Sequence, residues 1–445
     1  MGLERIGRGL ALLALACTTA CVADNQAATS AAAPATKGGD DRNGAYDLIA
    51  GWWKPAPDHD SVWTYGSASG VWPDTPDRVL AVFWGDQRRN PIRPAGGGGG
   101  GGGGGQPTGR NNPNERQRNF LMAVNRDGKI VENWSQWDSM FNRPHQIYVN
   151  PYDPQRAVWV DERGGEGVHE SIYKFSNDGK QLLMKLVDPR PVSGESDAQG
   201  RVPAARENLK PGPLDFGQNA VLAFLPNGDF LIGDGYQNGR VERFSSTGDF
   251  ISEFGTVDEC VRPESVQPTK PAYCTSGGAH PAGQFDLIHG IAVDRQNRIY
   301  VSDRMNHRIQ IFDEKGTPVD QWNDIWDPVA IMIDVNDKVW ILDATLNRIL
   351  RFSMQGQLED YFGTFGQASS LGRPGFTCSN ADEKKKAGIP DFQPGACGGF
   401  SLPHQMSVDS DGNVYVAQFN AGWIDKYVPK AGADKTRLIG QPLKP

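Results

Sequence analysis

The 445-residue sequence lacks several features that define whole classes of protein. It has no basic excess: the formal net charge is −8, and its lysines and arginines are scattered, which argues against a nucleic-acid partner. Its N-terminal apolar stretch, residues 10–16, is too short to span a bilayer. Histidine is also scarce, with 7 in the chain, so the position of each one carries information.

The N-terminal region has the pattern of an export leader. A basic start followed by the short apolar stretch predicts a signal peptide over residues 1–21. Cys17 and Cys21 each follow a small residue, so we expect either cleavage and release or a lipid anchor at Cys21. Residues 22–50 are predicted to be a disordered, low-complexity tether. We therefore expect an exported protein, periplasmic or extracellular, whose only membrane contact is that anchor.

Cysteine is the next scarce residue, with 6 in the chain. Beyond the leader the cysteines are Cys260, Cys274, Cys378 and Cys397, and neither neighbouring pair has the CxxC spacing of a metal site. Four cysteines allow three connectivities. Proximity favours Cys260–Cys274 and Cys378–Cys397. Each bridge would close a loop and stabilise the folded state by about 3 kcal/mol.

The chain does contain a recurring strand–turn–strand unit. Residues 289–304 alternate apolar and smaller residues, turn at residues 294–297, and resume an apolar run that ends at Asp303. A third strand is expected at residues 308–312 and a fourth near Pro318. The result is a four-stranded antiparallel unit of about 40 residues, which is the size of a propeller blade.

This unit recurs along the chain. Asp303 follows His289 by 14 positions. The same spacing separates Ala220 from Asp234, Val329 from Asp343 and His404 from Gln418, with two extra residues from His145 to Asp161 and a weaker copy from Ser69 to Phe83. Six blades are predicted, starting near residues 66, 141, 216, 285, 326 and 400.

One blade cannot cover both of its own faces, so we expect a closed ring: an all-β, six-bladed β-propeller over residues 51–445. The unbroken glycine run at residues 96–105 is expected to be a loop of the first blade.

Three of the seven histidines occupy equivalent positions in this repeat. His145, His289 and His404 begin the innermost strands of blades two, four and six. In a sixfold ring alternate blades lie about 120° apart, so three imidazoles at one depth would converge on the axis. Three neutral imidazoles with an open fourth position are a common catalytic zinc arrangement. The alternative is three unrelated histidines at strand starts.

Further motifs carry a resemblance to a known family. They are Asp-Gly-Tyr-Gln-Asn-Gly-Arg-Val at residues 234–241, Gly-Gln-Phe-Asp-Leu-Ile-His at 283–289 and Ser-Asp-Arg-Met-Asn-His-Arg-Ile-Gln at 302–310. Over residues 141–430 the chain resembles peptidyl-α-hydroxyglycine α-amidating lyase, the second catalytic unit of the peptide-amidating enzymes. That family is a six-bladed propeller of NHL-type repeats. It cleaves a carbinolamide N–C bond and releases a peptide amide and glyoxylate.

The resemblance implies roles for individual residues. The zinc histidines of the family match His145, His289 and His404, its catalytic tyrosine matches Tyr236, and an arginine facing the substrate matches Arg304. Zinc would acidify the substrate hydroxyl, Tyr236 would act as a base or proton relay, and Arg304 would pair with the substrate carboxylate. The alternatives are that Tyr236 caps a turn and that Arg304 forms a blade-to-blade ion pair with an aspartate such as Asp303 or Asp234.

The sequence also departs from the family. Gln405 stands where the family has an aspartate that helps to hold a structural calcium, which puts calcium in question. A first-blade arginine of the family has no secure match, and Arg88, Arg89 and Arg163 are the candidates. Gln237 replaces a family cysteine. The chain shows no copper monooxygenase unit to supply a hydroxyglycine substrate.

The histidine pattern predicts a zinc site, and the family resemblance implies a zinc-dependent lyase that acts on a small-molecule or peptide substrate. We expect a monomer. Two alternatives stay open. One is another metal-dependent propeller hydrolase such as a lactonase, although propeller lactonases usually hold calcium with Asp, Asn and Glu. The other is a non-enzymatic NHL-type binding propeller at the cell surface. The fold does not decide among them, whereas the geometry of the three imidazoles does.

Overall fold

The computed structural model describes residues 43–59, 63–88, 115–165, 167–190, 211–262, 267, 269–276, 278–344, 346–363, 402–419 and 421–443. The chain divides into two compact units, Met1–Ala35 and Thr36–Pro445, and every described residue belongs to the second. None of the described helices has the length and apolarity that crossing a bilayer requires. The predicted signal peptide, most of the predicted tether and the glycine run lie outside the described residues.

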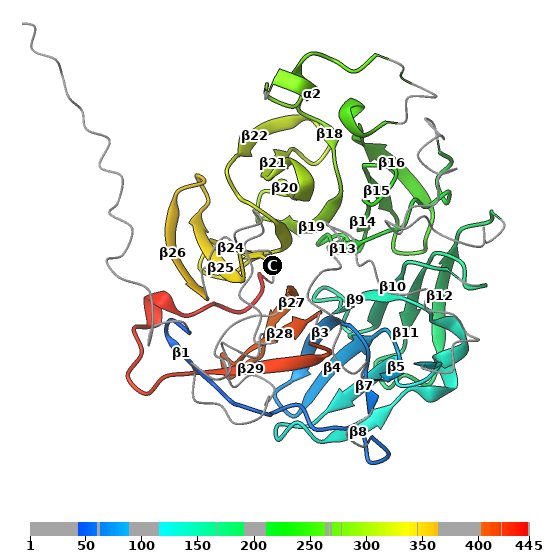
Figure 1. Cartoon of the computed structure of the whole chain (residues 1–445), viewed down its shortest axis with the longest axis vertical. Helices are drawn as coiled ribbons and strands as arrows, with labels where there is room; N and C mark the ends of the chain where they lie inside the picture. The colour runs from blue at the N-terminus through cyan, green and yellow to red at the C-terminus, as the bar shows by residue number, and fades with distance from the viewer. Residues whose placement is uncertain are drawn as a thin grey trace, which may run out of the picture. The chain divides into compact units, whose positions relative to one another are not determined.

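The main elements of the described residues are six four-stranded antiparallel sheets, which fan out around a central axis (Figure 1). From the axis outward, the strands are β3 (Ala68–Thr75), β4 (Arg78–Phe83), β7 (Leu121–Val124) and β8 (Ile130–Asn133) in blade one; β9 (Pro144–Val149), β10 (Val158–Glu162), β11 (Ser171–Phe175) and β12 (Leu182–Val187) in blade two; β13 (Val221–Phe224), β14 (Phe230–Asp234), β15 (Arg240–Phe244) and β16 (Phe250–Phe254) in blade three; β19 (Ile288–Val293), β20 (Ile299–Asp303), β21 (Arg308–Phe312) and β22 (Pro318–Trp322) in blade four; β23 (Pro328–Ile333), β24 (Lys338–Asp343), β25 (Arg348–Ser353) and β26 (Leu358–Gly363) in blade five; and β27 (Pro403–Val408), β28 (Val414–Gln418), β29 (Trp423–Pro429) and β1 (Tyr46–Leu48) in blade six. The predicted all-β, six-bladed propeller is confirmed.

The outermost strand of blade six comes from the N-terminal side of the propeller. Strand β1 pairs antiparallel with β29, with Tyr46 opposite Pro429. Tyr46 is fully buried, and its hydroxyl accepts a hydrogen bond from the backbone N–H of Ile439 at 2.6 Å. Segments from both ends of the chain therefore close the ring. The propeller begins no later than Tyr46, which corrects the predicted boundary at residue 51.

Shorter elements surround the blades. They are a three-stranded sheet of β2 (Trp63–Thr64), β5 (Asp86–Arg88) and β6 (Glu115–Arg116); the parallel pair β17 (Thr256–Val257) and β18 (Gln284–Phe285); the one-turn helix α2 (Tyr273–Ser276); and the 3₁₀ turns η2 (Ser135–Met140), η3 (Glu259–Val261), η4 (Arg304–Asn306) and η5 (Lys435–Arg437). Cys260 and Cys274 form the predicted disulfide in the loop between β17 and β18. Cys378 and Cys397 lie outside the described residues.

The aspartate that ends the second strand explains the 14-residue spacing of the repeat. In blade four the buried Asp303 carboxylate accepts the backbone N–H of Asp286 at 2.9 Å and binds the Arg308 guanidinium, with 2.8 Å between Nε and Oδ2. The same two contacts occur at Asp234 with Gly217 and Arg240, and at Asp343 with Asp327 and Arg348. This one side chain therefore ties the turn entering the first strand to the start of the third.

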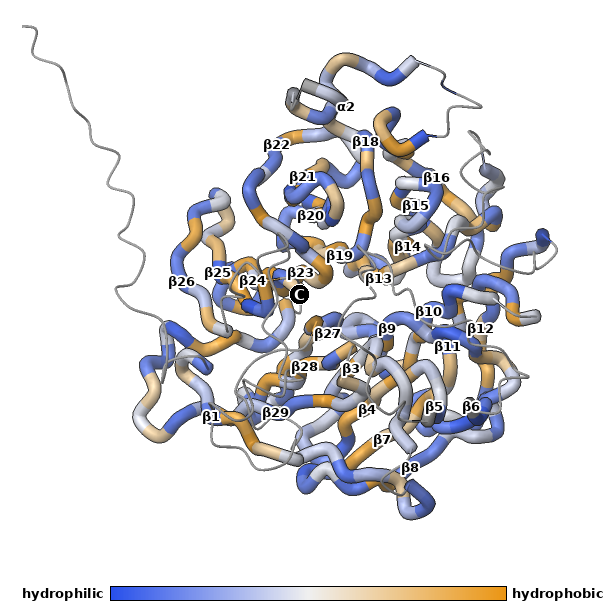
Figure 2. The backbone as a smooth tube through the Cα atoms, in the orientation of Figure 1, coloured by the Kyte–Doolittle hydropathy of each residue, from blue (hydrophilic) through white to orange (hydrophobic). Residues whose placement is uncertain are grey.

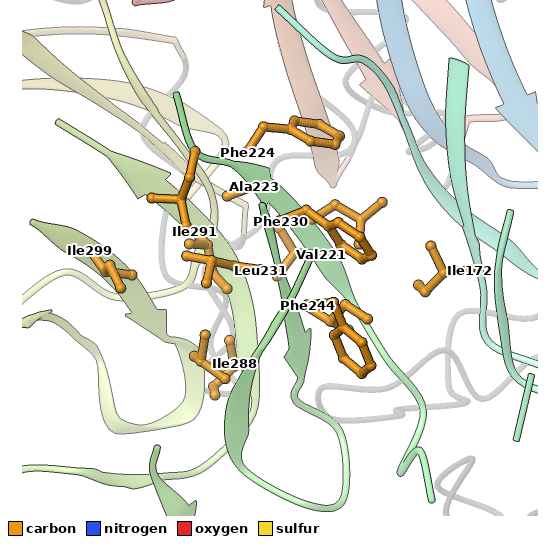
Figure 3. Close-up of a cluster of buried hydrophobic side chains, with 14 of the residues drawn as sticks. Ile172, Val221, Ala223, Phe224, Phe230, Leu231, Phe244, Ile288, Ile291 and Ile299 are labelled. Atoms are coloured by element: carbon orange, nitrogen blue, oxygen red, sulfur yellow. The ribbon is translucent and has the colours of Figure 1, made fainter. Parts of the chain in front are cut away.

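Apolar side chains fill the spaces between blades. Hydrophobic residues are concentrated in parts of the strands, and hydrophilic residues are frequent in the outer strands and the connecting turns (Figure 2). In the cluster of Figure 3, Ile172 of blade two and Phe230 and Phe244 of blade three pack in one core with Ile288 and Ile291 of blade four. Each buried side chain of this size contributes about 1.5–3 kcal/mol relative to exposure. Because neighbouring blades share these contacts, the stability of the ring is distributed over all of them.

Candidate metal centre

Each of the three predicted histidines lies at a break in strand pairing. In β19, Ile288 pairs with Asp303 and Gly290 with Ser302, so His289 is skipped. His404 is skipped in the same way in β27, and His145 in β9. A bulge of this kind locally re-aims a side chain.

The structure brings the three imidazoles together at one depth, as the alternation of blades predicts. Each offers a ligand nitrogen, and these nitrogens all lie within 4.8 Å of one another. The ring centroids are 4.8 Å apart for His145 and His289, 4.5 Å for His145 and His404, and 4.8 Å for His289 and His404. The near-equal separations and full burial of His145 and His289 argue against three unrelated histidines.

Backbone carbonyls of the intervening blades fix the tautomer of every ring. Nδ1 of His145 lies 2.6 Å from the Ala220 carbonyl oxygen, and Nδ1 of His289 lies 2.7 Å from that of Val329. Nδ1 of His404 makes the same contact with Ser69, at 2.7 Å. A carbonyl oxygen only accepts hydrogen bonds, so each Nδ1 carries the proton and each Nε2 keeps its lone pair.

Burial keeps these rings neutral. The pKa values of His145, His289 and His404 are all held well below the usual value, chiefly because burial disfavours the imidazolium, and then by neighbouring positive charge from Arg163 or the other histidines. At neutral pH the three Nε2 atoms are therefore available as electron-pair donors. Neutral imidazole is the form that binds a metal ion.

The donor set fits a zinc ion. Tetrahedral zinc with bonds of about 2.0–2.1 Å places its ligand nitrogens roughly 3.3 Å apart. The three nitrogens here all lie within 4.8 Å of one another, so the three side chains are close enough to share one ion. His404 offers Nε2 with no hydrogen-bond partner among the described residues, and its ring stacks on Phe419 at 5.0 Å. The residues thus provide three ligands and leave a fourth position for another group.

Tyr236 reaches the same centre from blade three. Its hydroxyl oxygen lies 3.1 Å from Nε2 of His145 and 3.1 Å from Nε2 of His289. One hydroxyl proton cannot satisfy two acceptor nitrogens together, so the cluster holds more lone pairs than protons. A cation resolves this imbalance, which is a second observation in favour of a metal. The Tyr236 hydroxyl therefore contacts two of the histidines, which the alternative role of a turn-capping aromatic does not explain.

The position of Tyr236 depends on the glycine before it. A Cβ on Gly235 would lie 1.9 Å from the backbone oxygen of Ile288, a distance that no side chain tolerates. The turn after β14 therefore rests directly on the backbone of blade four. This close contact places the phenol between the histidines of blades two and four.

Arg304 lies near the centre, but it is held by another partner. It is buried, and its Nε lies 2.5 Å from Oδ1 of Asp327. The predicted alternative partners, Asp303 and Asp234, are bound instead by Arg308 and Arg240. The blade-to-blade ion pair that was the alternative for Arg304 thus exists, with Asp327 as the aspartate, and it compensates much of the positive charge of Arg304.

Arg163 is the sequence candidate that the structure brings to the site. Its guanidinium carbon lies 3.8 Å from the centroid of the Tyr236 ring, and its Nη2 donates to Oε1 of Gln218 at 2.6 Å. The side chain of Arg88 and all of Arg89 lie outside the described residues. Arg163 follows Asp161 and Glu162 at the end of β10, the strand end that also carries Tyr236 and Arg304 in blades three and four. That shared position is the sequence signal that could have singled out Arg163.

A buried carboxyl group lies behind His145. Oδ2 of Asp161 is 3.6 Å from Nδ1 of His145, and Oδ1 accepts the backbone N–H of Gln146 at 2.6 Å. Burial raises the pKa of Asp161 to about 8, so this carboxyl group is mostly protonated at pH 7. It therefore contributes little negative charge near the histidines.

Beyond the histidines, the same inner strands line an apolar cavity of about 120 Å³. Its lining includes Trp72, Ala223, Ile291 and Ile331, with Gln146 and Gln405 as polar members, and carries no Asp, Glu, Lys, Arg or His among the described residues. Tyr236, Arg163 and Arg304 do not line this cavity. None of these three candidate site residues therefore belongs to the apolar cavity.

Gln405 cross-links three blades beside this cavity. Its Oε1 accepts the backbone N–H of Val71 at 2.9 Å and that of Ile147 at 3.3 Å, and its Nε2 donates to the Ile147 carbonyl at 3.0 Å. The amide is 3% exposed. Its oxygen and nitrogen are both engaged by neutral backbone groups, so a calcium ligand is not the role that these contacts describe.

Gln405→Leu is expected to lower the free energy of unfolding by about 1–3 kcal/mol, because it leaves buried backbone N–H groups without an acceptor. Urea titration followed by tryptophan fluorescence measures the change. The matched control is Gln296→Leu, at an exposed turn position, which should shift the transition very little. Equal transitions for the two variants would show that the cross-link contributes nothing.

The fold and repeat define the class of protein. A family model described as NHL repeat matches residues 285–312, which cover blade four from β18 to the end of β21. The chain is therefore a six-bladed β-propeller that contains an NHL repeat.

Comparison with individual proteins finds relatives of about 25% sequence identity. NHL repeat-containing protein 3 of Homo sapiens is 25% identical over 316 residues, which cover 69% of this chain and 72% of that protein. Peptidyl-alpha-hydroxyglycine alpha-amidating lyase 1 of Drosophila melanogaster is 26% identical over 337 residues, which cover 73% of this chain and 51% of that protein. A solved structure described as a streptogramin B lyase superposes with a TM-score of 0.47 and 12% identity, over 86% of this chain and 98% of that one. At such identities, relatives share a fold more reliably than an activity.

Proposed function

We propose that this protein is a zinc-dependent lyase that cleaves a carbinolamide C–N bond, as in the conversion of a peptidyl-α-hydroxyglycine to a peptide amide and glyoxylate. The observation that carries the proposal is the convergence of three neutral imidazoles, from His145, His289 and His404, on the hydroxyl of Tyr236. The similarity to an amidating lyase of Drosophila melanogaster supports the choice of reaction.

A zinc ion bound by the three Nε2 atoms would supply a Lewis acid that makes the substrate hydroxyl more acidic. The protein groups provide the proton path. Tyr236, with its oxygen 3.1 Å from two of the ligand nitrogens, is placed to take the hydroxyl proton and pass a proton to the amide nitrogen. The C–N bond breaks, the hydroxyl carbon becomes the aldehyde of glyoxylate, and the nitrogen leaves as a primary amide. No water or redox partner is consumed.

The surroundings of the site favour this acid–base chemistry. The Nδ1–carbonyl bonds hold each ring in the one orientation that points Nε2 at the centre, which lowers the cost of assembling the site. The guanidinium group of Arg163 adds positive charge beside the histidines, with a smaller net contribution from Arg304, which is paired with Asp327. This positive charge favours the binding of an anionic substrate.

A second candidate function is a non-enzymatic binding propeller. It is favoured by the match to NHL repeat-containing protein 3, which extends over 72% of that protein, against 51% for the Drosophila lyase. A calcium-dependent lactonase is less well supported, because the converging ligands are imidazoles rather than carboxylates.

The direct test is glyoxylate release from a synthetic N-acyl-α-hydroxyglycine. We expect about one zinc per chain by metal analysis, steady glyoxylate release, and loss of that release after chelation, with recovery on adding zinc. Chelation should leave the circular dichroism spectrum unchanged, because the blades do not depend on the ion. A protein that retains zinc but releases no glyoxylate would favour another substrate, and a protein that binds no zinc would favour the binding propeller.

The cellular setting is proposed with the same function. The disulfide between Cys260 and Cys274 supports export to an oxidising compartment, periplasmic or extracellular. We propose a monomer, attached to the membrane only if Cys21 is lipidated.

A further inference from the structure

The two arginines beside the candidate metal centre differ in how their charges are balanced. Arg304 forms an ion pair with Asp327, with 2.5 Å between Nε and Oδ1. Arg163 is 9% exposed, and no carboxylate of the described residues forms an ion pair with it. Its Nε is buried without a hydrogen-bond partner among those residues, and its one hydrogen bond there is the neutral contact with Gln218. Within the part of the chain that the structure describes, Arg163 is thus a buried cation without an ion-pair partner.

A buried guanidinium without an anion is costly, by several kcal/mol after relaxation of the surroundings. The nearest acidic residues do not remove that cost. Glu162 directs its carboxylate at the backbone N–H groups of Asn142, Arg143 and Gly164, at 3.0, 2.8 and 2.8 Å. Asp161 accepts from Gln146 and lies beside His145. An unbalanced charge kept at such a cost is typical of a binding site for an anionic ligand.

The contact with Tyr236 fixes where that anion would lie. The guanidinium carbon is 3.8 Å from the centre of the tyrosine ring, and the hydroxyl of the same ring is 3.1 Å from Nε2 of His145. Contact with the ring holds the guanidinium beside the histidines, where its remaining N–H groups are available to a ligand in the site. A small acid with a hydroxyl on the adjacent carbon could therefore contact both the guanidinium and the metal centre.

We propose that Arg163 binds the substrate carboxylate and selects acids over neutral analogues, in place of Arg304, which the family resemblance suggested for that role. The proposal rests on the proposed lyase function and names its specificity residue. The arginine comes from blade two, at the strand end that carries Tyr236 in blade three. Arg304 is then a positioning residue, held by Asp327 beside the site.

Equilibrium binding tests the proposal without turnover. The probes are N-acetylglycine, which has the carboxylate but no hydroxyl, and N-acetylglycinamide, which is neutral. Isothermal titration calorimetry should show that the unsubstituted protein binds the acid at least about 10-fold more tightly than the amide. Arg163→Gln should weaken acid binding about 10- to 100-fold, the effect expected for hydrogen bonds to a charged group, and leave amide binding unchanged.

Three further variants make the result specific. Arg163→Lys keeps the charge without the planar fork and should retain part of the preference for the acid. Arg304→Lys retains a cation beside Asp327 and should keep the preference, because the partner of Arg304 is Asp327 and not the ligand. Arg295→Gln, at an exposed position paired with Asp337, should behave like the unsubstituted protein. Retention of the full preference by Arg163→Gln, or no preference in the unsubstituted protein, would overturn the proposal.

This test and the test of the lyase fail in distinguishable ways. If glyoxylate is not released but Arg163→Gln erases acid binding, Arg163 remains a carboxylate-binding residue of a protein with another activity. If glyoxylate is released, Arg163→Gln should raise the KM for the hydroxy acid much more than it lowers kcat. An unchanged KM in an active Arg163→Gln variant would assign carboxylate recognition to another residue.

Discussion

Tyr236→Phe is expected to lower the turnover of an N-acyl-α-hydroxyglycine by about 10²–10⁴-fold, the usual contribution of a positioned acid or base. The hydroxyl oxygen lies 3.1 Å from Nε2 of both His145 and His289. It therefore lies at the point where the histidine side chains converge. Phenylalanine keeps the ring that packs against the Arg163 guanidinium. The substitution therefore removes the proton path and leaves the shape of the site.

The zinc content and the binding of N-acetylglycine separate this effect from a structural one. Both should be unchanged in Tyr236→Phe, because the ligand nitrogens and the guanidinium stay in place. The matched control is Tyr152→Phe, whose ring lines the apolar cavity beyond the histidines. Full turnover in Tyr236→Phe would remove this residue from the mechanism. A loss of zinc along with turnover would instead make it a support for the metal site.

The architecture and the three histidines could be predicted because the repeat encodes them locally. The aspartate at the end of each second strand has a defined task, shown by Asp303 with Asp286 and Arg308, and that task fixes the spacing. Once the six blades are counted, the alternation of His145, His289 and His404 places them around one axis without knowledge of any contact. The disulfide of Cys260 and Cys274 follows from proximity in the same way.

Other features depend on contacts that no local pattern contains. Strand β1 is only three residues long and pairs with β29 from the far end of the chain, so tertiary pairing rather than composition creates it. Asp327 lies beyond blade four, at the entry to β23, and its pairing with Arg304 needs the turns of two blades to meet. The stacking of Arg163 on Tyr236 likewise joins blades two and three. Sequence reasoning therefore found the three histidines more readily than the residues that balance charge around them.

His289→Ala should abolish glyoxylate release and reduce zinc affinity by more than about 100-fold, since loss of a group that merely orients a ligand already costs 10- to 100-fold. Two imidazoles cannot hold a protein zinc site that three define. The propeller should stay folded, because stability is shared by the apolar contacts between all blades. The Val329 carbonyl loses its hydrogen-bond donor, which is expected to cost about 1–3 kcal/mol.

Metal analysis after dialysis against a weak chelator, together with thermal unfolding, measures both parts of this expectation. His169→Ala is the matched control, because His169 is partly exposed and belongs to no metal-binding cluster of the described residues. A His289→Ala protein that kept one zinc per chain would place the ion elsewhere, and the proposed lyase would lose its centre. Unfolding of His289→Ala at ordinary temperature would mean that the histidine cluster is a structural link between blades two, four and six. The expected outcome is a folded ring without zinc and without activity. The three blades that carry the histidines are each held by apolar contacts with their neighbouring blades, and these contacts do not depend on the ion.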